Sequence, residues 1–451
     1  MTTAAKVVSL DRRAFVRGDH VEIAERLVAR LRAEGEVVYA DGAVWRYSDK
    51  SHVFEAVAQA QLSRIAQRFA GSEIKGSKKP LRLNAGSVSG SIKLAEDLLC
   101  TPGFFGEAPR GVVFSTSFVE VRASGVVQHA HSPSHRARSA YGFGFQLNPQ
   151  PTRFLGFLEQ VFAPDDDIAQ KIELIQEFVG AAMLGCCTEY QRAIILVGAG
   201  ANGKGVLATI IERAMPPGSW VAIAPQDFGD EYRAAMLAGK LLNIVSELPE
   251  ADILDSGAFK AVISGDPRTA RHIRQAPFTF RPVAAHLFAA NRLPGTADHT
   301  HGFWRRVVVL EFNRVFNEAE QESELAKRII DAELPGIVSW FLLGAQRVLA
   351  NGDYAIPPSS ARAVDKWRQS ADQVRAFVCA CTRRLDAGAD VRDGVPAEEL
   401  YRAYRAWSQD NGHRAMASNK FAERMGQLGL PAARTRDRNF YPLRLEKGEE
   451  A

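Results

Sequence analysis

The stretch ILVGAGANGKGVLATII, residues 195–211, places an apolar run before a glycine-rich loop and a second apolar run after it. This order predicts a strand, a loop and a helix, which is the context in which a GxxxxGK motif binds phosphate. Glycines let successive backbone N–H groups face an anion, and the N-terminus of the helix adds positive potential. We therefore predict a nucleotide site formed by Gly198, Gly200, Asn202, Gly203, Lys204 and Gly205, with Lys204 reaching the outer phosphates.

Position 205 departs from the usual phosphate loop. In most such loops the residue after the lysine is Ser or Thr, whose hydroxyl binds Mg²⁺. Glycine stands there instead, and two explanations remain open. Either Mg²⁺ is held by water, phosphate oxygens and a downstream acid, or the site binds nucleotide and hydrolyses it poorly. Thr209 lies one helical turn further on and is a weaker source of the missing hydroxyl.

Three further apolar runs follow the loop, and each is flanked by polar residues that suit phosphate chemistry. The first expected strand, in KLLNIVSELPE, ends at Glu247, whose carboxylate would meet Mg²⁺ or the attacking water. The second, in HLFAANRLP, ends at Asn291, whose side chain could orient that water. Arg305 and Arg306 precede RVVVLEF, either as solvated charges or as an arginine finger that acts on a neighbour's nucleotide in a closed ring. Short continuous apolar runs are typical of parallel strands buried on both faces, so we predict an α/β core.

The segments before this core read as smaller units. Asp41-Gly42 between alternating apolar runs predicts a hairpin, and helical periodicity from Phe54 to about Phe69 completes a small α+β module over 1–105. Residues 106–190 contain two short strands turning at Ser124-Gly125 and a helix with apolar residues at 168, 172, 175, 179 and 182. We interpret Asp165 to Asp167 as helix-capping charge and not as a metal cluster.

The last segment, 361–451, reads as helix, turn, helix and basic hairpin, and its 17 Lys and Arg against 13 Asp and Glu account for the whole net charge of +4. Lys420 and Arg424 lie on one face of the second helix and are candidate DNA contacts. A tail that binds protein or is purely structural remains the alternative, because the excess charge is small.

Composition bounds the class of protein. With 451 residues and 46% hydrophobic residues, the chain can build two or three packed cores. We find neither a signal-like start nor an apolar run long enough for a bilayer, and we expect a cytoplasmic protein with no membrane partner. The five cysteines lack zinc spacing and are expected to be free buried thiols; His129, His131 and His135 lie in a loop with no expected acidic partner, so no metal site is predicted there.

Taken together, the motifs resemble those of the superfamily 3 (AAA+) helicases. The GxxxNGK loop, the strand ending in Glu, FKAVISGD followed by a basic segment and FTFRP, then FAANRLP and GFWRRVVVLEF, are most similar to the branch of phage and plasmid primase-helicases and of the poxvirus primase-helicase. The resemblance covers about 110–350. It implies a helicase-associated region over 106–190, an AAA+ P-loop ATPase core over 191–350 and a winged-helix-like domain over 361–451. About 100 residues without zinc-type cysteines precede it, so we expect no primase domain.

The resemblance also assigns roles to residues. Glu247 matches the second acidic motif, Asn291 the sensor asparagine, and Arg305 or Arg306 the finger. Lys260 and Gly265-Asp266 match the motif between them. The hairpin that follows holds DNA in the ring channel of this superfamily, which makes Arg271, His272 and Arg274 candidate contacts, although an ordinary surface hairpin remains the alternative.

The function implied is that of an ATP- and Mg²⁺-dependent replicative DNA helicase of a phage, plasmid or other mobile element. It would form a homo-oligomeric ring, expected to be a hexamer, move 3′ to 5′ on single-stranded DNA and unwind a replication origin beside a separate primase or initiator. The alternative is an ATP-gated DNA-binding initiator or switch without unwinding activity, which Gly205 keeps open.

Overall fold

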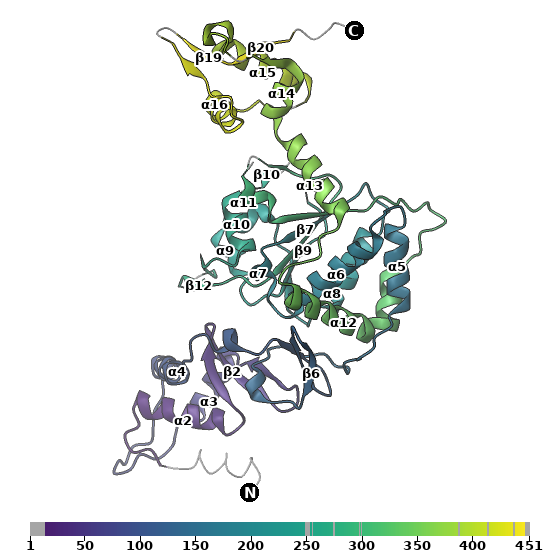
Figure 1. Ribbon diagram of the computed structural model, residues 1–451. Coiled ribbons are helices and arrows are strands. Elements are labelled where there is room, and N and C mark those ends of the chain that lie inside the picture. The colour runs from purple at the N-terminus through teal and green to yellow at the C-terminus, as the bar shows by residue number, and fades with distance from the viewer. Residues whose placement is uncertain are drawn as a thin grey trace.

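The protein folds into three successive parts, each with its own apolar core (Figure 1). An N-terminal part lies at one end of the chain's path, a central α/β part follows, and a small C-terminal part is joined to the centre through helix α13. The computed structural model describes residues 14–248, 253–254, 256–273, 276–296, 298, 300–386, 388–412, 415–435 and 438–446.

A five-stranded sheet forms the middle of the central part. Its order is β15-β7-β13-β9-β8, and every neighbouring pair is parallel. The four predicted runs all form strands, and a short edge strand, β8, is added to them. The bounds are β7 Ala193–Val197, β8 Trp220–Val221, β9 Leu242–Val245, β13 Ala285–Ala290 and β15 Val307–Glu311. The predicted mixed α/β class with a parallel sheet is therefore confirmed.

Helices cover both faces of this sheet, and the alternation of side chains decides which residues they meet. Ile194 and Leu196 of β7 pack on the face covered by α8, whereas Ala193, Ile195 and Val197 pack on the opposite face. The first face is covered by α5 (Thr152–Phe162), α6 (Ile168–Met183), α8 (Lys204–Ala214) and α12 (Leu325–Asn351). The second is covered by α10 (Ser256–Ile263), α11 (His301–Trp304) and α13 (Pro358–Ala371). Helix α9 (Glu231–Ala235) packs instead on β11 (Arg268–Ala270).

The N-terminal part packs three helices on a three-stranded antiparallel sheet. The hairpin turns at Asp41-Gly42, both with positive φ, as predicted. The expected helix from Phe54 is wrong at its start, because Val53–Ala56 is a third strand and α3 begins only at Gln59. The bounds are α2 His20–Arg32, β1 Val37–Ala40, β2 Ala43–Ser48, β3 Val53–Ala56, α3 Gln59–Gln67 and α4 Ala85–Leu99.

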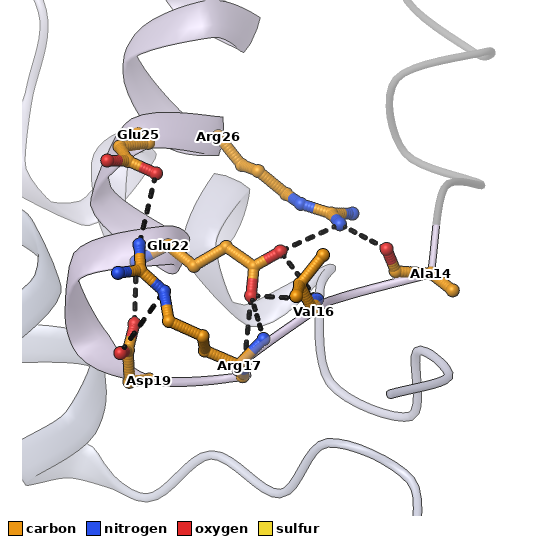
Figure 2. Close-up of polar contacts among 8 residues, drawn as sticks. Ala14, Val16, Arg17, Asp19, Glu22, Glu25 and Arg26 are labelled. Atoms are coloured by element: carbon orange, nitrogen blue, oxygen red, sulfur yellow. Dashed lines mark hydrogen bonds and ion pairs between the residues drawn. The ribbon is translucent and has the colours of Figure 1, made fainter. Parts of the chain in front are cut away.

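One carboxylate ties the first described segment to α2 (Figure 2). The two oxygens of Glu22 accept hydrogen bonds from the backbone N–H groups of Val16, Arg17 and Gly18 at 2.8–3.0 Å. Arg26 adds a contact of 3.2 Å from its guanidinium. Burial alone would raise the pKa of Glu22, but the three N–H donors outweigh it and lower the pKa to about 2.

We predict that Glu22→Gln lowers the free energy of unfolding of this part by about 2 kcal/mol at pH 7. Because the folded state depresses the pKa, the stabilisation is complete above pH 4.5 and is lost as pH falls toward 2. Thermal melts at several pH values measure it. Glu25→Gln is the control, since Glu25 is 55% exposed in its ion pair with Arg17. Equal melting temperatures for the two variants at pH 7 would contradict the prediction.

The segment between the N-terminal part and β7 carries an antiparallel sheet of β4 (Gly111–Val113), β5 (Phe118–Arg122) and β6 (Gly125–His129), which turns at Ser124-Gly125 as predicted. Of the aspartates interpreted as capping charge, Asp167 stands at the N-cap position of α6, but its side chain makes no capping hydrogen bond. Asp165 instead contacts the fully buried ammonium of Lys171 at 2.9 Å, and Asp167 accepts the N–H of Ser359. Both aspartates fix tertiary packing.

Helix α13 belongs to the central part. Ala363 and Trp367 pack with Phe303 and Trp304, whereas the core of the C-terminal part begins at Val374. The boundary expected at residue 361 thus falls inside α13.

The C-terminal part contains the expected two helices and hairpin as α15, α16 and β18–β19, and it adds a preceding helix, α14, and further short strands. Its strands form a sheet β17-β19-β18 and a pair β16-β20. The bounds are α14 Gln373–Cys381, β16 Thr382–Arg384, β17 Val395–Pro396, α15 Ala397–Asp410, α16 Ser418–Gln427, β18 Ala433–Arg434, β19 Asn439–Tyr441 and β20 Leu443–Leu445.

Two general expectations can be compared with the structure. In the part of the chain that the structure describes, no helix is both long and apolar enough to cross a bilayer. All five cysteines are free, but only Cys186 and Cys187 are buried, whereas Cys100 and Cys379 are exposed. The expectation that all five thiols are buried is therefore wrong.

Candidate nucleotide-binding site

The predicted loop, acid and asparagine lie at one edge of the central sheet. Val197 pairs with Ala290 across β7 and β13, and Val245 pairs with Phe288 across β9 and β13. The residues just beyond these strand ends are Gly198, Ser246 and Asn291, so they meet at the same edge. The carboxyl edge of a parallel sheet is where ligands bind in such folds.

Three residues of the loop 198–203 have positive φ values, a conformation that favours glycine. Gly200, Ala201 and Gly203 have φ values of 105°, 47° and 88°. A Cβ at position 198 would lie 2.1 Å from the amide nitrogen of Asn202, and one at 203 would lie 2.7 Å from a methyl of Val161. Glycine is therefore needed for close packing at 198 and for both backbone and packing at 203.

Lys204 starts α8 and turns back over this loop. Its ammonium donates hydrogen bonds to the carbonyl of Gly198 at 2.5 Å and to Oδ1 of Asn202 at 3.1 Å. Desolvation lowers the pKa of Lys204, while the negative charge of Glu247 opposes that shift. The amide nitrogen of Asn202 is buried and has no partner. The loop thus gathers a cation and an unused donor where an anion could take both.

Gly205 is in open space, because a Cβ there would meet no atom within 4 Å. Its φ is not positive, and it belongs to the first turn of α8, so a larger residue would fit. The hydroxyl of Thr209 donates to the carbonyl of Gly205 at 2.9 Å and is satisfied within the helix. The loop and the first turn of α8 offer no side-chain hydroxyl that faces outward.

The acidic and amide groups at this edge are accessible. Ser246, Glu247 and Asn291 are all exposed. The N–H of Leu248 donates to the carbonyl of Ala289 at 2.8 Å, which holds the chain after β9 against β13. Glu247 is close enough to Lys204 to affect its charge state. Exposed oxygen ligands beside a phosphate loop suit Mg²⁺, which prefers oxygen and keeps several waters.

Arg305 and Arg306 lie at the opposite edge. Val307 pairs with Ala193 at the start of the strands, whereas the loop follows their ends, so about 15 Å of strand separates the arginines from the loop. The guanidinium of Arg305 is exposed and bonds Gln191 at 2.6 Å. Arg306 is half-buried and donates twice to the hydroxyl of Ser264, at 2.7 and 3.0 Å. Burial, and then the charge of Arg305, lower the pKa of Arg306.

The predicted hairpin is present as β11 (Arg268–Ala270) and β12 (Phe278–Phe280), which follow α10. In α10, Lys260 pairs with Asp298 at 2.9 Å. Gly265, beyond its end, has a φ of 69°.

The hairpin turn has mixed chemistry. The guanidinium of Arg271 is held by Glu231 at 2.5 Å and by the hydroxyl of Tyr232 at 2.8 Å. His272 is exposed and stacks on Phe278, with ring centroids 5.1 Å apart. Arg274 lies outside the described residues. Sequence reasoning missed Ile273, which is 77% exposed; an apolar residue in a basic turn was the available signal.

The two tail candidates have different surroundings. Lys420 is exposed and, within the described residues, its ammonium pairs with Glu423, three residues along α16. Arg424 instead pairs with the buried carboxylate of Asp372 at 2.6 Å and ties α16 to the start of α14. In this structure its guanidinium is engaged in packing, so it is a poor candidate for a nucleic-acid contact.

His129, His131 and His135 contact other protein groups that hold them in the fold. His129 pairs with Glu120 at 2.8 Å, which corrects the expectation that no acid lies nearby. His131 bonds the carbonyl of Phe114, and His135 stacks on Phe118 with centroids 3.9 Å apart. Among the residues that the structure describes, no group of three His, Cys, Asp or Glu side chains could hold a metal.

Two segments of the chain match known protein families. Residues 196–306 match the model of a family of unknown function (DUF5906), and residues 369–444 match a model described as poxvirus D5 protein-like. A protein of Acanthamoeba polyphaga mimivirus named "Putative helicase" is 23% identical over 294 residues, which are 57% of this chain and 28% of that protein. The chain therefore spans less than a third of that relative. The sequence is similar to D5-like and helicase-named viral proteins.

Solved structures of the NrS-1 C-terminal region in its apo state align with most of the chain. One has a TM-score of 0.47 and 13% identity, covering 93% of this chain and 99% of that one. Another, of residues 305–718, has a TM-score of 0.47 and 12% identity, covering 95% and 99%.

Proposed function

We propose that this protein is an ATP-dependent DNA helicase of the superfamily 3 (AAA+) type that serves replication of a mobile element. The observation that carries the proposal is the meeting of the phosphate loop, Glu247 and Asn291 at one edge of a parallel sheet. Similarity to a protein named as a helicase and to the D5-like model supports it.

In the proposed reaction, the loop N–H groups and the start of α8 bind the phosphates of ATP. Lys204 exchanges the carbonyl of Gly198 and the amide of Asn202 for phosphate oxygens. Glu247 orients the attacking water and takes its proton, and Asn291 fixes the position of that water. The exposed oxygens at this edge fit Mg²⁺, which when bound neutralises charge on the phosphates.

The arginines support an assembly of subunits. Because Arg305 lies at the far edge of the sheet, it cannot reach the nucleotide of its own chain. Its exposed guanidinium can reach the nucleotide of a neighbour packed head to tail, and a closed ring is the assembly in which every site is completed in this way. We therefore propose a homo-oligomeric ring, with six subunits as the expected number.

The hairpin β11–β12 is the proposed contact with single-stranded DNA. His272 and Ile273 expose a ring and an apolar side chain at its turn. Bases stack on such rings with little sequence preference, and an apolar side chain beside the ring can pack against a base. Translocation 3′ to 5′, unwinding at an origin and a winged-helix role for the C-terminal part with Lys420 as a DNA contact belong to the same proposal.

Strand displacement tests this function. Purified protein with ATP and Mg²⁺ is mixed with a forked duplex that carries a 3′ or a 5′ single-stranded tail. We expect displacement with the 3′ tail, ATP turnover stimulated by single-stranded DNA, and binding to DNA that weakens steeply with salt. DNA-stimulated turnover without displacement on either fork would exclude the helicase.

The second candidate is an ATP-gated DNA-binding initiator or switch, and Gly205 is the feature that favours it. Without a hydroxyl at this position, the site could hold nucleotide and turn it over slowly. That protein would bind DNA more tightly with ATP than with ADP, and it would leave both forks intact.

A variant of the hairpin tests the DNA contact separately. We predict that Ile273→Ser weakens binding to single-stranded DNA by about tenfold, because an apolar surface available to bases is lost. Affinity for nucleotide should not change. Val315→Ser is the matched control, since Val315 is also exposed, at 62%, but lies outside the hairpin. Fluorescence anisotropy of a labelled oligonucleotide measures both, and equal affinities would rule out the hairpin contact.

A further inference from the structure

The site lacks a hydroxyl where phosphate loops usually supply one to Mg²⁺, and the structure shows that packing does not forbid it. A Cβ at position 205 would have no atom within 4 Å, and the backbone there is helical. Thr209 cannot replace the hydroxyl, because it is bonded to the carbonyl of Gly205 one turn below. Another residue at the sheet edge must offer the oxygen if metal is held by a side-chain hydroxyl.

Ser246, the first residue after β9, is the candidate. Leu242 and Ile244 pack on the face of the sheet that α8 covers, in the same cluster as Leu207 of α8. Val245 packs against the cluster on the other face. This alternation ends with β9, because the chain bends at Ser246 and Leu248 then packs with the second cluster. The bend leaves the side chains of both Ser246 and Glu247 exposed at the carboxyl edge of the sheet.

The position along the sheet also fits. Val245 is level with Phe288, so Ser246 comes level with Ala289, one residue before the Ala290 that pairs with Val197. Ser246 thus follows β9 directly and lies about level with Leu196 of β7, two residues before the phosphate loop begins at Gly198. Its side chain is exposed, and no hydrogen bond within the described residues occupies its hydroxyl.

We propose that the hydroxyl of Ser246 takes the place of the hydroxyl missing at position 205 as an oxygen ligand on the Mg²⁺ side of the bound nucleotide. Glu247 is then left to act on the attacking water. Mg²⁺ binds through one or two protein oxygens together with phosphates and waters, so one neutral hydroxyl suffices. This inference rests on the proposed nucleotide site and assigns to it a side-chain ligand for Mg²⁺.

The experiment measures how much Mg²⁺ tightens nucleotide binding, without reference to turnover. The dissociation constant of the fluorescent nucleotide mant-ADP is determined with Mg²⁺ and with EDTA for the full chain. For the wild type we expect Mg²⁺ to tighten binding by about tenfold, and for Ser246→Ala we expect this gain to fall to about twofold or less, with affinity in EDTA unchanged.

Second variants make the test specific. Gly205→Ser in the Ser246→Ala background should restore the Mg²⁺ gain, whereas Gly205→Ala, which adds the same Cβ without the hydroxyl, should not. In Ser246→Cys the gain should be larger with Cd²⁺ than with Mg²⁺, because a thiolate prefers the softer ion. Melting temperatures show whether each variant is folded.

The outcomes separate this inference from the proposed function. If Ser246→Ala keeps the full Mg²⁺ gain, or if the wild type binds mant-ADP with no gain at all, the Ser246 ligand is excluded and the nucleotide site remains. If the wild type binds mant-ADP no better than Lys204→Ala in either medium, the nucleotide site itself is excluded, and the inference falls with it.

Discussion

Lys204→Ala is expected to reduce ATP turnover by at least about 100-fold and to weaken ATP binding, because the only cation of the phosphate loop is removed. Among the described residues its ammonium forms no ion pair and bonds the carbonyl of Gly198 and the side-chain oxygen of Asn202, so its removal breaks no ion pair seen there. Phosphate release and mant-ATP binding measure the two effects.

The control for this variant is Lys240→Ala. Lys240 precedes β9 and donates to the carbonyl of Gly218, which is also a contact with a backbone oxygen, but it lies at the amino edge of the sheet. It should leave turnover within about twofold of the wild type. Unchanged turnover in Lys204→Ala, with a normal melting temperature, would show that the loop is not the nucleotide site.

Arg305→Ala is expected to lower turnover by about 1000-fold while leaving nucleotide affinity almost unchanged, since an arginine finger stabilises charge that develops only in the transition state. The exposed guanidinium bonds only Gln191 among the described residues, so stability should change little. Arg306→Ala is expected to do the reverse: it removes two hydrogen bonds to Ser264 and should lower the melting temperature.

Mixing variants tests whether the arginine acts between subunits. Lys204→Ala subunits keep Arg305 but lack a working loop, and Arg305→Ala subunits keep the loop but lack the arginine. An equimolar mixture should recover part of the turnover that neither variant shows alone, because some sites then combine an intact loop with a neighbour's arginine. Absence of recovery in a mixture that still assembles would contradict action in trans.

The central sheet could be predicted because its signals are local. Each of the runs around Ile195, Ile244, Leu287 and Val309 is apolar enough to be buried on both faces, and Gly200 and Gly203 stand where the backbone has a positive φ. The hairpin at Asp41-Gly42 was predictable for the same reason. In these places neighbouring residues alone determine the conformation.

Other features depend on partners distant in the sequence. Asp165 and Asp167 resemble capping residues until Lys171 and Ser359 are seen beside them. In the sequence Arg424 resembles an exposed DNA contact, yet in the structure it pairs with Asp372, 52 residues away. The choice between two adjacent arginines depended on Ser264, which no local pattern connects with Arg306. Charge and periodicity cannot specify which tertiary partner satisfies a polar side chain.

Helix α13 connects the C-terminal part to two segments of the proposed ATPase site. The indole N–H of Trp367 bonds the carbonyl of Pro294, three residues after Asn291, at 3.0 Å. The same indole packs against Trp304, the residue before Arg305, with ring centroids 5.2 Å apart. When DNA or a partner protein binds the C-terminal part, a movement of α13 would thus be transmitted both to the segment after Asn291, the proposed sensor of a subunit's own nucleotide, and to Arg305, the proposed finger for its neighbour's nucleotide. Through this one helix, the C-terminal part could then change the rate of ATP hydrolysis in its own subunit and in the neighbouring subunit together.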